Sequence, residues 1–416
     1  MKIAVVGGGS TYTSELAEGF GANAAALGID EVVLVDPAAD KLAVIGPLVQ
    51  RIMRRHGSRA RVGWTPNLDR GVDGAAVVLL QLRVGGQSAR IRDEAFPLEC
   101  GCVGQETTGA GGLAKALRTI PVVLRIAERV RRFAAPGAWI VDFTNPVGMV
   151  TRALLDEGHR AVGLCNVAIG FQRRFAGLLG RAPADVVLDH VGLNHLTWET
   201  AVRLDGRDVL PELLKEHRQA VADEVDLPEA VFADGLVPSY YLRYFYGHDA
   251  EVERLRTAPS RGEEVARIEA ELWDLYQDDT LDRKPELLSR RGGAYYSEAA
   301  VALMRSLLTE DGAVHAVNLR NRGFLPYLPD EAVIEVSARV GAAITPSARA
   351  TLGPRQRGLV SAVAAYEELG VEAAVRGGER RVYEALLAHP LVGQHDLAEG
   401  LTRRLIATGR DHLPWA

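Results

Sequence analysis

Four segments of the chain carry polar side chains at positions where packing does not require them. They are residues 104–109 (GQETTG), 143–146 (FTNP), 165–166 (CN) and 192–195 (GLNH). The second and third each come at the end of an apolar run that predicts a buried strand. Because the ends of parallel strands meet at one crevice of a sheet, we expect Asn145 and Asn166 to face the same ligand.

A glycine-rich loop directly follows the first apolar run of the chain. Gly7, Gly9 and Ser10 belong to a GGGS turn between a predicted strand and a predicted helix. Glycines there let the backbone approach a pyrophosphate, which the N-terminus of the next helix favours. The second predicted strand ends in Asp36, whose carboxylate can accept both ribose hydroxyls, so the pattern predicts NAD rather than NADP. Tyr12 replaces the third glycine of the usual G-x-G-x-x-G pattern, and a plain turn without a ligand is the alternative.

The elements that must position these residues alternate between strand and helix over the first half of the chain. A helix pattern follows Ser14, and continuous apolar runs of this kind suit strands that are buried on both faces. We therefore expect an α/β fold, with a Rossmann-type doubly wound parallel sheet forming an NAD-binding domain over residues 1–165. The predicted strands are residues 2–6, 31–36, 75–82, 138–143 and 161–165.

The pattern changes after about residue 189. Residues 195–206 alternate apolar and polar side chains and predict an antiparallel ribbon, and a helix pattern follows Ser260. Strand-like runs come at residues 313–319 and 332–336, and the chain is mostly helical from about residue 356. We expect a mixed α+β domain over residues 166–416 that binds substrate and metal, with the active site in the cleft between the two domains.

Composition excludes several classes of protein. The chain has 416 residues, of which 47% are hydrophobic and 25% charged, and its net charge is −6. These values are typical of a globular protein and not of a disordered one, and the negative charge argues against nucleic acid as a partner. The sequence has no apolar run long enough for a transmembrane helix. Three cysteines do not suit a disulfide framework, so we expect a reducing compartment.

Seven motifs in order along the chain resemble those of glycoside hydrolase family 4, the NAD- and metal-dependent glycosidases. Within that family the chain is most similar to the 6-phospho-β-glucosidases. The resemblance implies a fold like that of lactate and malate dehydrogenases, bound NAD and a divalent metal, and a phosphorylated disaccharide or β-glucoside as substrate. The motifs are VVGGGSTYT, VGQETTGAGG, FTNPVG, GLCNVAIG, GLNHLTW, YLRYFY and RRGGAYYS.

The resemblance also implies a mechanism that differs from hydrolysis by two carboxylates. NAD⁺ takes a hydride from C3 of the sugar, which acidifies the proton at C2. A base removes that proton, the leaving group departs from C1 by elimination, water adds, and the hydride returns to C3. The metal acts as a Lewis acid at the sugar oxygens.

The family motifs imply roles for particular residues of this chain. Cys165 and His195 are the implied metal ligands, and Mn²⁺ is the family's metal, although a Cys/His pair by softness alone favours Zn²⁺. Tyr241 is the implied catalytic base, with Tyr244 as the alternative, and a phenol in this role needs a lowered pKa. Asn166 takes the place of an aspartate that α-specific members carry, which favours β-glycosides.

Substrate anchoring by the same resemblance falls to Arg90, Asn145, Asn166 and Arg261. Arginine suits phosphate or vicinal hydroxyls because its planar guanidinium donates two parallel hydrogen bonds. Arg290 and Arg291 are further candidates for a phosphate, and Glu106 is a candidate carboxylate near the metal or the cofactor. His190 lies an odd number of residues before His195, so we exclude it as a ligand on the assumption that both lie on one strand.

Three alternatives remain open from the sequence. One is an NAD-dependent 2-hydroxy acid dehydrogenase, which has a related fold, and another is a non-catalytic protein that senses NAD. The third is a family 4 glycosidase whose substrate is unphosphorylated or carries another charge. By the family resemblance we also expect a homodimer or homotetramer. Because the implied substrates form when sugars are phosphorylated during uptake, we expect a cytoplasmic location.

Overall fold

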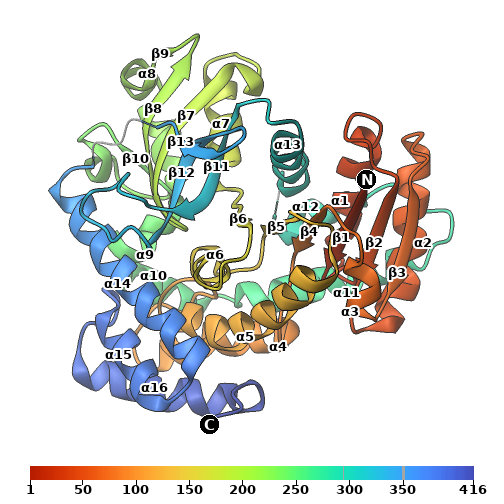
Figure 1. Cartoon of the computed structure of the whole chain (residues 1–416). Helices are drawn as coiled ribbons and strands as arrows, with labels where there is room; N and C mark the ends of the chain where they lie inside the picture. The colour runs from red at the N-terminus through yellow and green to blue at the C-terminus, as the bar shows by residue number, and fades with distance from the viewer. Residues whose placement is uncertain (294, 349–351) are drawn as a thin grey trace.

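The computed structural model of the chain describes residues 1–293, 295–348 and 352–416. The described residues form one sheet in the order β10-β8-β7-β12-β11-β6-β5-β4-β1-β2-β3, with β13 beside β12 and β9 beside β8 (Figure 1). Helices cover both faces, so the expected α/β fold is confirmed.

Six parallel strands make up the N-terminal part of the sheet. Their order, β3-β2-β1-β4-β5-β6, is that of a dinucleotide-binding domain. Five were predicted from apolar runs, whereas β3 was missed because it is an edge strand in which only Val62 is buried. The strands are β1 (Lys2–Val6), β2 (Glu31–Val35), β3 (Arg61–Thr65), β4 (Val77–Leu80), β5 (Trp139–Asp142) and β6 (Ala161–Gly163).

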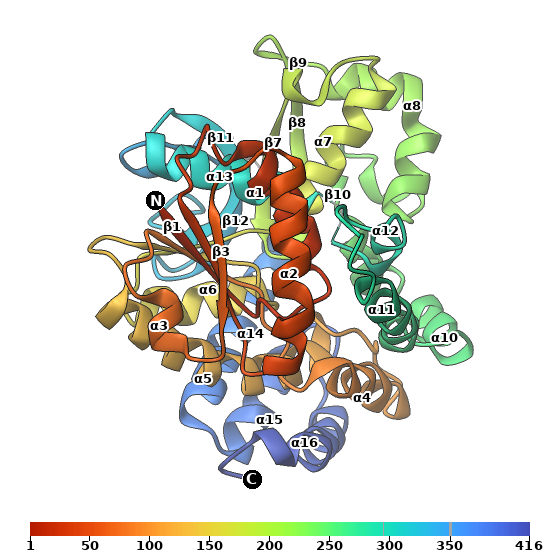
Figure 2. The same ribbon diagram turned by 90° about the vertical axis from the view of Figure 1, so that its right-hand side faces the viewer.

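Side chains of β1 enter two separate cores on the two faces of the sheet. Ile3 and Val5 belong to the core under α1, α2 and α13, and Ala4 and Val6 belong to the core under α5, α6 and α14 (Figure 2). A strand buried on both faces is therefore continuously apolar in sequence. The helices are α1 (Thr13–Asn23), α2 (Ala39–Arg55), α5 (Gly109–Phe133), α6 (Val147–Asp156), α13 (Tyr296–Thr309) and α14 (Pro354–Arg376).

Antiparallel strands continue the same sheet beyond β6. The junction is the pair Asn318 and Gly163, where a Cβ added to the glycine would lie 2.9 Å from the Asn318 Cβ and 2.2 Å from the Thr151 hydroxyl. Only glycine lets the strands meet this closely. The further strands are β7 (Val186–Leu193), β8 (Leu196–Leu204), β9 (Arg207–Asp208), β10 (Val237–Pro238), β11 (Ala313–Arg320), β12 (Val333–Val340) and β13 (Ile344–Pro346).

The helix predicted after Ser260 is α11, and Figure 2 shows it beside α12. It begins with a capping box, in which the Ser260 hydroxyl accepts from the Glu263 amide and the Glu263 carboxylate accepts from the Ser260 amide. The remaining helices are α3 (Leu68–Val72), α4 (Gly86–Glu99), α7 (Val167–Leu178), α8 (Leu210–Val225), α9 (Arg243–Tyr246), α10 (His248–Thr257), α11 (Arg261–Tyr276), α12 (Leu288–Arg291), α15 (Glu379–Ala388) and α16 (His395–Gly409). Among the described residues, none of these helices has the length and apolar character needed to cross a membrane.

Candidate functional site

A cavity of about 1110 Å³ opens at the carboxyl ends of the parallel strands. One wall follows β1, β2, β4 and β5, and the opposite wall comes from α11 and from the segment that contains η3 (Tyr240–Leu242) and α9. The predicted glycine loop and its acid, the predicted base, one predicted metal ligand and the four predicted substrate-binding residues line this cavity, whereas Cys165 does not. Those that line it are Gly7, Gly9, Ser10, Asp36, Arg90, Asn145, Asn166, His195, Tyr241 and Arg261.

The glycine loop rests on Asp36. The Asp36 carboxylate accepts from the Gly9 amide at 3.1 Å and from the Ala38 amide at 3.0 Å. A Cβ at Gly9 would lie 2.9 Å from the Asp36 carboxyl carbon, and Gly7 has a φ of +87°. Tyr12, at the position of the absent third glycine, donates its hydroxyl proton to the Gly293 carbonyl. The loop, the acid and the start of α1 together fit the pyrophosphate and ribose of NAD.

His195 presents one ring nitrogen to the cavity. The Thr107 hydroxyl lies 2.9 Å from Gln105 Oε1 and 2.9 Å from His195 Nδ1. Because the Gln105 oxygen can only accept, the hydroxyl donates to it and accepts from Nδ1–H, which leaves the lone pair on Nε2. Burial lowers the pKa of His195 to about 4, so the ring is neutral at physiological pH. A neutral imidazole with a free Nε2 suits a metal ligand.

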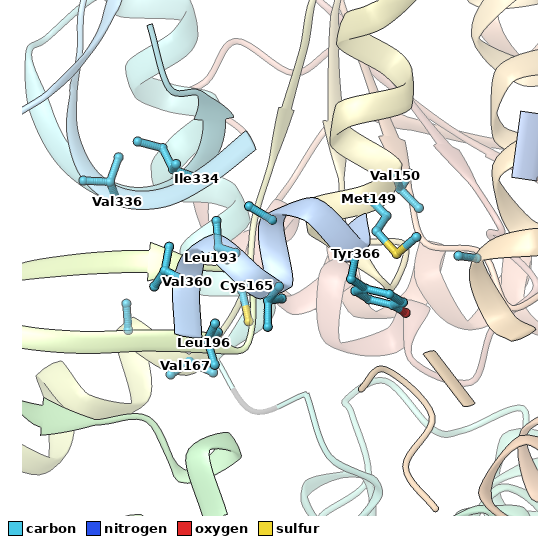
Figure 3. Close-up of a cluster of buried hydrophobic side chains, with 14 of the residues drawn as sticks. Met149, Val150, Cys165, Val167, Leu193, Leu196, Ile334, Val336, Val360 and Tyr366 are labelled. Atoms are coloured by element: carbon cyan, nitrogen blue, oxygen red, sulfur yellow. The ribbon is translucent and has the colours of Figure 1, made fainter. Parts of the chain in front are cut away.

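Cys165 lies behind the cavity wall and is 3% exposed. Figure 3 shows its sulfur among Val167, Leu193 and Leu196. Burial and the charge of Glu335 raise the pKa of this thiol, whereas hydrogen bonds from the Val167 amide and the Asn194 side chain favour the thiolate.

The thiol and the imidazole are chemically suitable donors for a divalent metal. The imidazole stacks on the Tyr241 ring, and the charge of the Cys165 sulfur raises the pKa of Tyr241. Among the described residues, no group of three or more His, Cys, Asp and Glu side chains could hold a metal ion. Two protein ligands leave coordination positions for sugar oxygens or water.

Tyr241 stacks on His195, with ring centroids 3.7 Å apart and an angle of 6° between the planes. Burial and the neighbouring Tyr240 raise the pKa of Tyr241, which is opposite to the lowering that a catalytic phenol needs. The nearby cation Arg243 does not lower the pKa of Tyr241 to offset this, because its guanidinium donates to the Tyr244 hydroxyl at 3.1 Å. As a base, Tyr241 therefore requires positive charge beyond that of its side-chain neighbours.

A cluster of cations surrounds Glu106, and sequence reasoning found only part of it. Its carboxylate contacts Arg83 at 2.5 Å, Lys115 at 2.7 Å and Arg90 at 3.2 Å. Burial opposes ionisation of Glu106, but these cations hold its pKa well below the usual range. Burial lowers the pKa of Lys115 to about 7. Arg83 and Lys115 carried no local signal in the sequence, because each is defined by partners on other elements.

Glu94 connects the two predicted substrate arginines. Its Oε1 accepts from Arg90 Nε at 2.8 Å, and its Oε2 accepts from the Gly262 amide at 2.7 Å, in the first turn of α11. Arg261, one residue earlier, donates to Glu264 at 2.9 Å and to the Arg290 carbonyl at 2.7 Å. One carboxylate thus links helix α4 to helix α11 across the cavity.

Other predicted residues differ in how well the structure suits them to a ligand. Asn145 lines the cavity, and its buried Oδ1 has no hydrogen-bond partner among the described residues, as expected for an atom that awaits a ligand donor. Arg291 lines the cavity but pairs with Glu269 at 2.7 Å. Arg290 does not line it.

His190 does not line the cavity, and two buried carboxylates contact its ring. Its two ring nitrogens contact Glu199 at 2.6 Å and Glu335 at 2.9 Å. The prediction assumed that His190 and His195 share a strand, but His195 lies in the turn after β7, with a φ of +63°. The turn, and not the spacing along a strand, separates the two rings.

Comparisons with known proteins agree with this geometry. A sequence model described as "Family 4 glycosyl hydrolase" matches residues 2–181, and one described as "Family 4 glycosyl hydrolase C-terminal domain" matches residues 190–392. The "Probable 6-phospho-beta-glucosidase" of Bacillus subtilis is 35% identical over 435 residues, which cover 100% of this chain and 97% of that protein.

Solved structures give the same result. The 6-phospho-β-glucosidase of Thermotoga maritima, solved with manganese, NAD⁺ and glucose-6-phosphate, has a TM-score of 0.93 at 34% identity and covers 99% of each chain. Malate dehydrogenase of Cryptosporidium parvum has a TM-score of 0.57 at 15% identity, covering 90% of this chain and 99% of that one, which confirms the dehydrogenase-like fold. The chain belongs to the family 4 glycosyl hydrolases.

Proposed function

We propose that this protein hydrolyses 6-phospho-β-glucosides and that it needs NAD⁺ and a divalent metal, Mn²⁺, to do so. The observation that carries the proposal is that one cavity joins the Gly7–Gly9 loop, the stacked pair of His195 and Tyr241, and the arginines Arg90 and Arg261. Relatives of similar length that carry the name 6-phospho-beta-glucosidase support it.

Different residues would hold the two cofactors. NAD⁺ would lie on the glycine loop with its ribose at Asp36, and the metal would be held by Cys165 and His195. When bound, NAD⁺ supplies a hydride acceptor for C3 of the sugar and the metal supplies a Lewis acid for the sugar oxygens.

The side chains of the protein perform the remaining steps of the reaction. Tyr241 removes the proton from C2 through its phenolic oxygen, and Thr107 holds the His195 ring in one orientation. Arg90 and Arg261 bind the anionic end of the substrate, and the Asn145 amide orients it. The Asn166 amide cannot protonate a leaving group. This supports a β-glycoside as the substrate, and we propose that its sugar carries a 6-phosphate.

The test is release of nitrophenol from p-nitrophenyl β-D-glucoside 6-phosphate, with NAD⁺, Mn²⁺ and a thiol reductant added together and then each omitted. We expect release that requires both NAD⁺ and Mn²⁺, without accumulation of NADH, because the hydride returns to C3. Cys165→Ala should release no nitrophenol, whether or not Mn²⁺ is added.

Two results would contradict the proposal. Release from the unphosphorylated glucoside but not from the phosphorylated one would show that the substrate carries no phosphate, while the proposed reaction type would stand. Accumulation of NADH with a 2-hydroxy acid, and no nitrophenol from either glucoside, would favour a dehydrogenase.

A further inference from the structure

Helix α11 belongs to the second half of the chain, but it packs against α2 and α4 of the first half (Figure 2). Four of its side chains line the cavity at intervals of four residues, namely Arg261, Val265, Glu269 and Trp273. Residues four apart lie on one face of a helix. At 1.5 Å per residue this stripe is about 18 Å long. It begins at the proposed substrate arginine Arg261 and ends at Trp273.

The segment after the glycine loop holds this helix in place. The Tyr276 hydroxyl donates to the Thr11 carbonyl at 2.7 Å and lies 2.8 Å from the Ser14 hydroxyl oxygen. Two turns earlier in α11, Glu269 accepts from the Thr11 hydroxyl at 3.4 Å. Arg291 pairs with Glu269 at 2.7 Å, so this carboxylate does not face the proposed pyrophosphate site as an unpaired anion. Helix α11 is therefore docked on the residues that follow the GGGS turn.

Trp273 lies close to the segment that follows β2. The Lys41 ammonium lies over the Trp273 ring, 5.9 Å from its centroid, and Lys41 is in the first turn of α2, five residues after Asp36. On α11 itself, the Tyr276 ring meets the Trp273 ring nearly at right angles, with centroids 6.2 Å apart. Asp36, Lys41 and Trp273 all line the cavity. The indole is thus held beside the segment that carries Asp36, the proposed partner of the ribose.

The strand ends beside Asp36 contribute apolar side chains to the same cavity. Pro37 follows β2, and Pro66 and Leu68 follow β3, the strand that pairs with β2. Trp273 is partly buried and packs against the core under α1 and α2. A nucleoside base is flat and presents a π face on which aromatic side chains stack. An indole and apolar side chains next to a ribose acid therefore suit an adenine.

We infer that Trp273 binds the adenine of NAD and that α11 thereby holds the cofactor from the second half of the chain. The inference rests on the proposed function, because it concerns the cofactor of the proposed reaction. That reaction returns the hydride to the sugar in every cycle, so NAD does not have to leave between turnovers. A helix that contacts both the glycine loop and the adenosine half of NAD suits a cofactor that stays bound.

AMP is the probe for the adenosine half, because it carries adenine and ribose but no nicotinamide. The chain has five tryptophans, and of these only Trp273 lines the cavity in the described part of the chain. We expect AMP to quench the tryptophan fluorescence of the wild type and Trp273→Phe to lose that quenching. Trp64→Phe is the matched control, because Trp64 is 41% exposed on β3 and does not line the cavity. It should keep the quenching.

Calorimetric titration measures cofactor affinity apart from activity. Loss of one contact between a base and an aromatic ring should raise the Kd values of NAD⁺ and of ADP-ribose in Trp273→Ala by the same factor, about 10- to 100-fold. Leu275→Ala is the control on the same helix, because Leu275 is 45% exposed and does not line the cavity, and it should leave both Kd values unchanged. Affinity for glucose 6-phosphate at saturating NAD⁺ should change in neither variant.

Trp273→Phe keeps the inference testable if the alanine variant folds poorly. Its phenyl ring still packs against the core and offers an aromatic face, so it should bind NAD⁺ more tightly than Trp273→Ala does. Quenching by AMP that persists in Trp273→Phe would overturn the inference, and so would wild-type NAD⁺ affinity in Trp273→Ala. A loss of affinity for NAD⁺ but not for ADP-ribose would also overturn it, because the ring would then contact the nicotinamide half.

Failure of the proposed function gives a different result. A wild-type protein that binds neither NAD⁺ nor AMP would refute the proposed cofactor itself, and the inference with it. NAD⁺ binding by the wild type without quenching by NAD⁺ or AMP would overturn the inference alone. Quenching that depends on Trp273, with no release of nitrophenol from the phosphorylated glucoside, would refute only the proposed reaction.

Discussion

Two histidines five residues apart are held in opposite protonation states by their surroundings. Burial lowers the pKa of His195 to about 4, because its nearest hydrogen-bond partner is a neutral hydroxyl, that of Thr107. Burial also opposes the charged form of His190, but Glu199 and Glu335 raise its pKa to about 10. The first ring is therefore available to a metal, and the second is a fixed cation.

The roles of the two tyrosines can be separated by removing one hydroxyl at a time. Tyr241→Phe deletes the proposed base without changing ring stacking on His195, so kcat should fall by about 10²- to 10⁴-fold with NAD⁺ affinity unchanged. Tyr244→Phe removes a hydroxyl that accepts from Arg243 and should retain most activity. Steady-state kinetics of the two variants measure these effects. A larger fall in kcat in Tyr244→Phe than in Tyr241→Phe would make Tyr244 the base.

Asp36 should set the preference for NAD over NADP. Asp36→Asn keeps an oxygen for the Gly9 amide but loses the charge that repels a 2′-phosphate. We expect NAD⁺ affinity to fall by about tenfold, because hydrogen bonds to charged groups contribute about 1.5–3 kcal/mol, and discrimination against NADP⁺ to shrink. Titration with both cofactors measures this, and unchanged discrimination would mean that another group reads the ribose.

At the scale of elements, the cavity depends on contacts between helices that are far apart in sequence. Glu94 of α4 holds Arg90 in its own helix and the first turn of α11, next to Arg261. A helix N-terminus has unpaired amides and a partial positive charge, so a carboxylate there is doubly favourable. One side chain thus contacts both Arg90 and the first turn of the helix that carries Arg261.

Glu94→Gln should weaken substrate binding more than catalysis. A glutamine can accept through only one of its two terminal atoms, so either Arg90 or the Gly262 amide loses its partner. We expect KM for the phosphorylated glucoside to rise by about tenfold with a small change in kcat. The matched control is Glu99→Gln on the same helix, which loses only an exposed ion pair with Arg404 and should leave KM nearly unchanged. Equal KM values would show that Glu94 does not position the arginines.

At the scale of the molecule, one continuous sheet joins the parallel half to the antiparallel half. The glycine loop, Asn145 and Asn166 follow parallel strands, whereas His195 comes from the turn between two antiparallel strands. Because the strands are hydrogen-bonded in one sheet, the glycine loop and His195 are held in one frame.

Buried acids in this frame should make stability depend on pH. Burial raises the pKa of Glu367 to about 8 from 4.5, and the charge of Arg152 only partly opposes the shift. Between these values the folded state keeps a proton that the unfolded state has released, so stability falls as pH rises through that window. Glu367→Gln removes this loss of stability. Between about pH 5 and about pH 8 its free energy of unfolding should therefore rise relative to that of the wild type, by about 1 kcal/mol or more.

Urea unfolding at several pH values measures the effect. Glu368→Gln is the control, because that carboxylate is adjacent in sequence, half exposed and paired with Arg152, and it should not change the slope. Parallel curves for wild type and Glu367→Gln would mean that Glu367 titrates in the folded protein at its ordinary value.

Local patterns in the sequence were sufficient for five of the six strands of the parallel sheet and for the glycine loop, whereas the edge strand β3 was missed. Continuous apolar runs predict buried strands because the helices cover both faces, and the GGGS turn with Asp36 indicates a dinucleotide site because its parts are fixed by neighbouring strand ends. The ordered motifs also indicated the family, which the comparisons confirm.

Only the tertiary structure decided how these residues are supported. Lys115 beside Glu106, Glu94 beside Gly262, and Glu335 beside His190 and Asn194 are contacts between elements distant in the chain. Periodicity and spacing cannot predict such contacts, because they depend on which elements become neighbours when the sheet closes. Burial has the same origin, and it is burial that makes His195 neutral and raises the pKa of Tyr241.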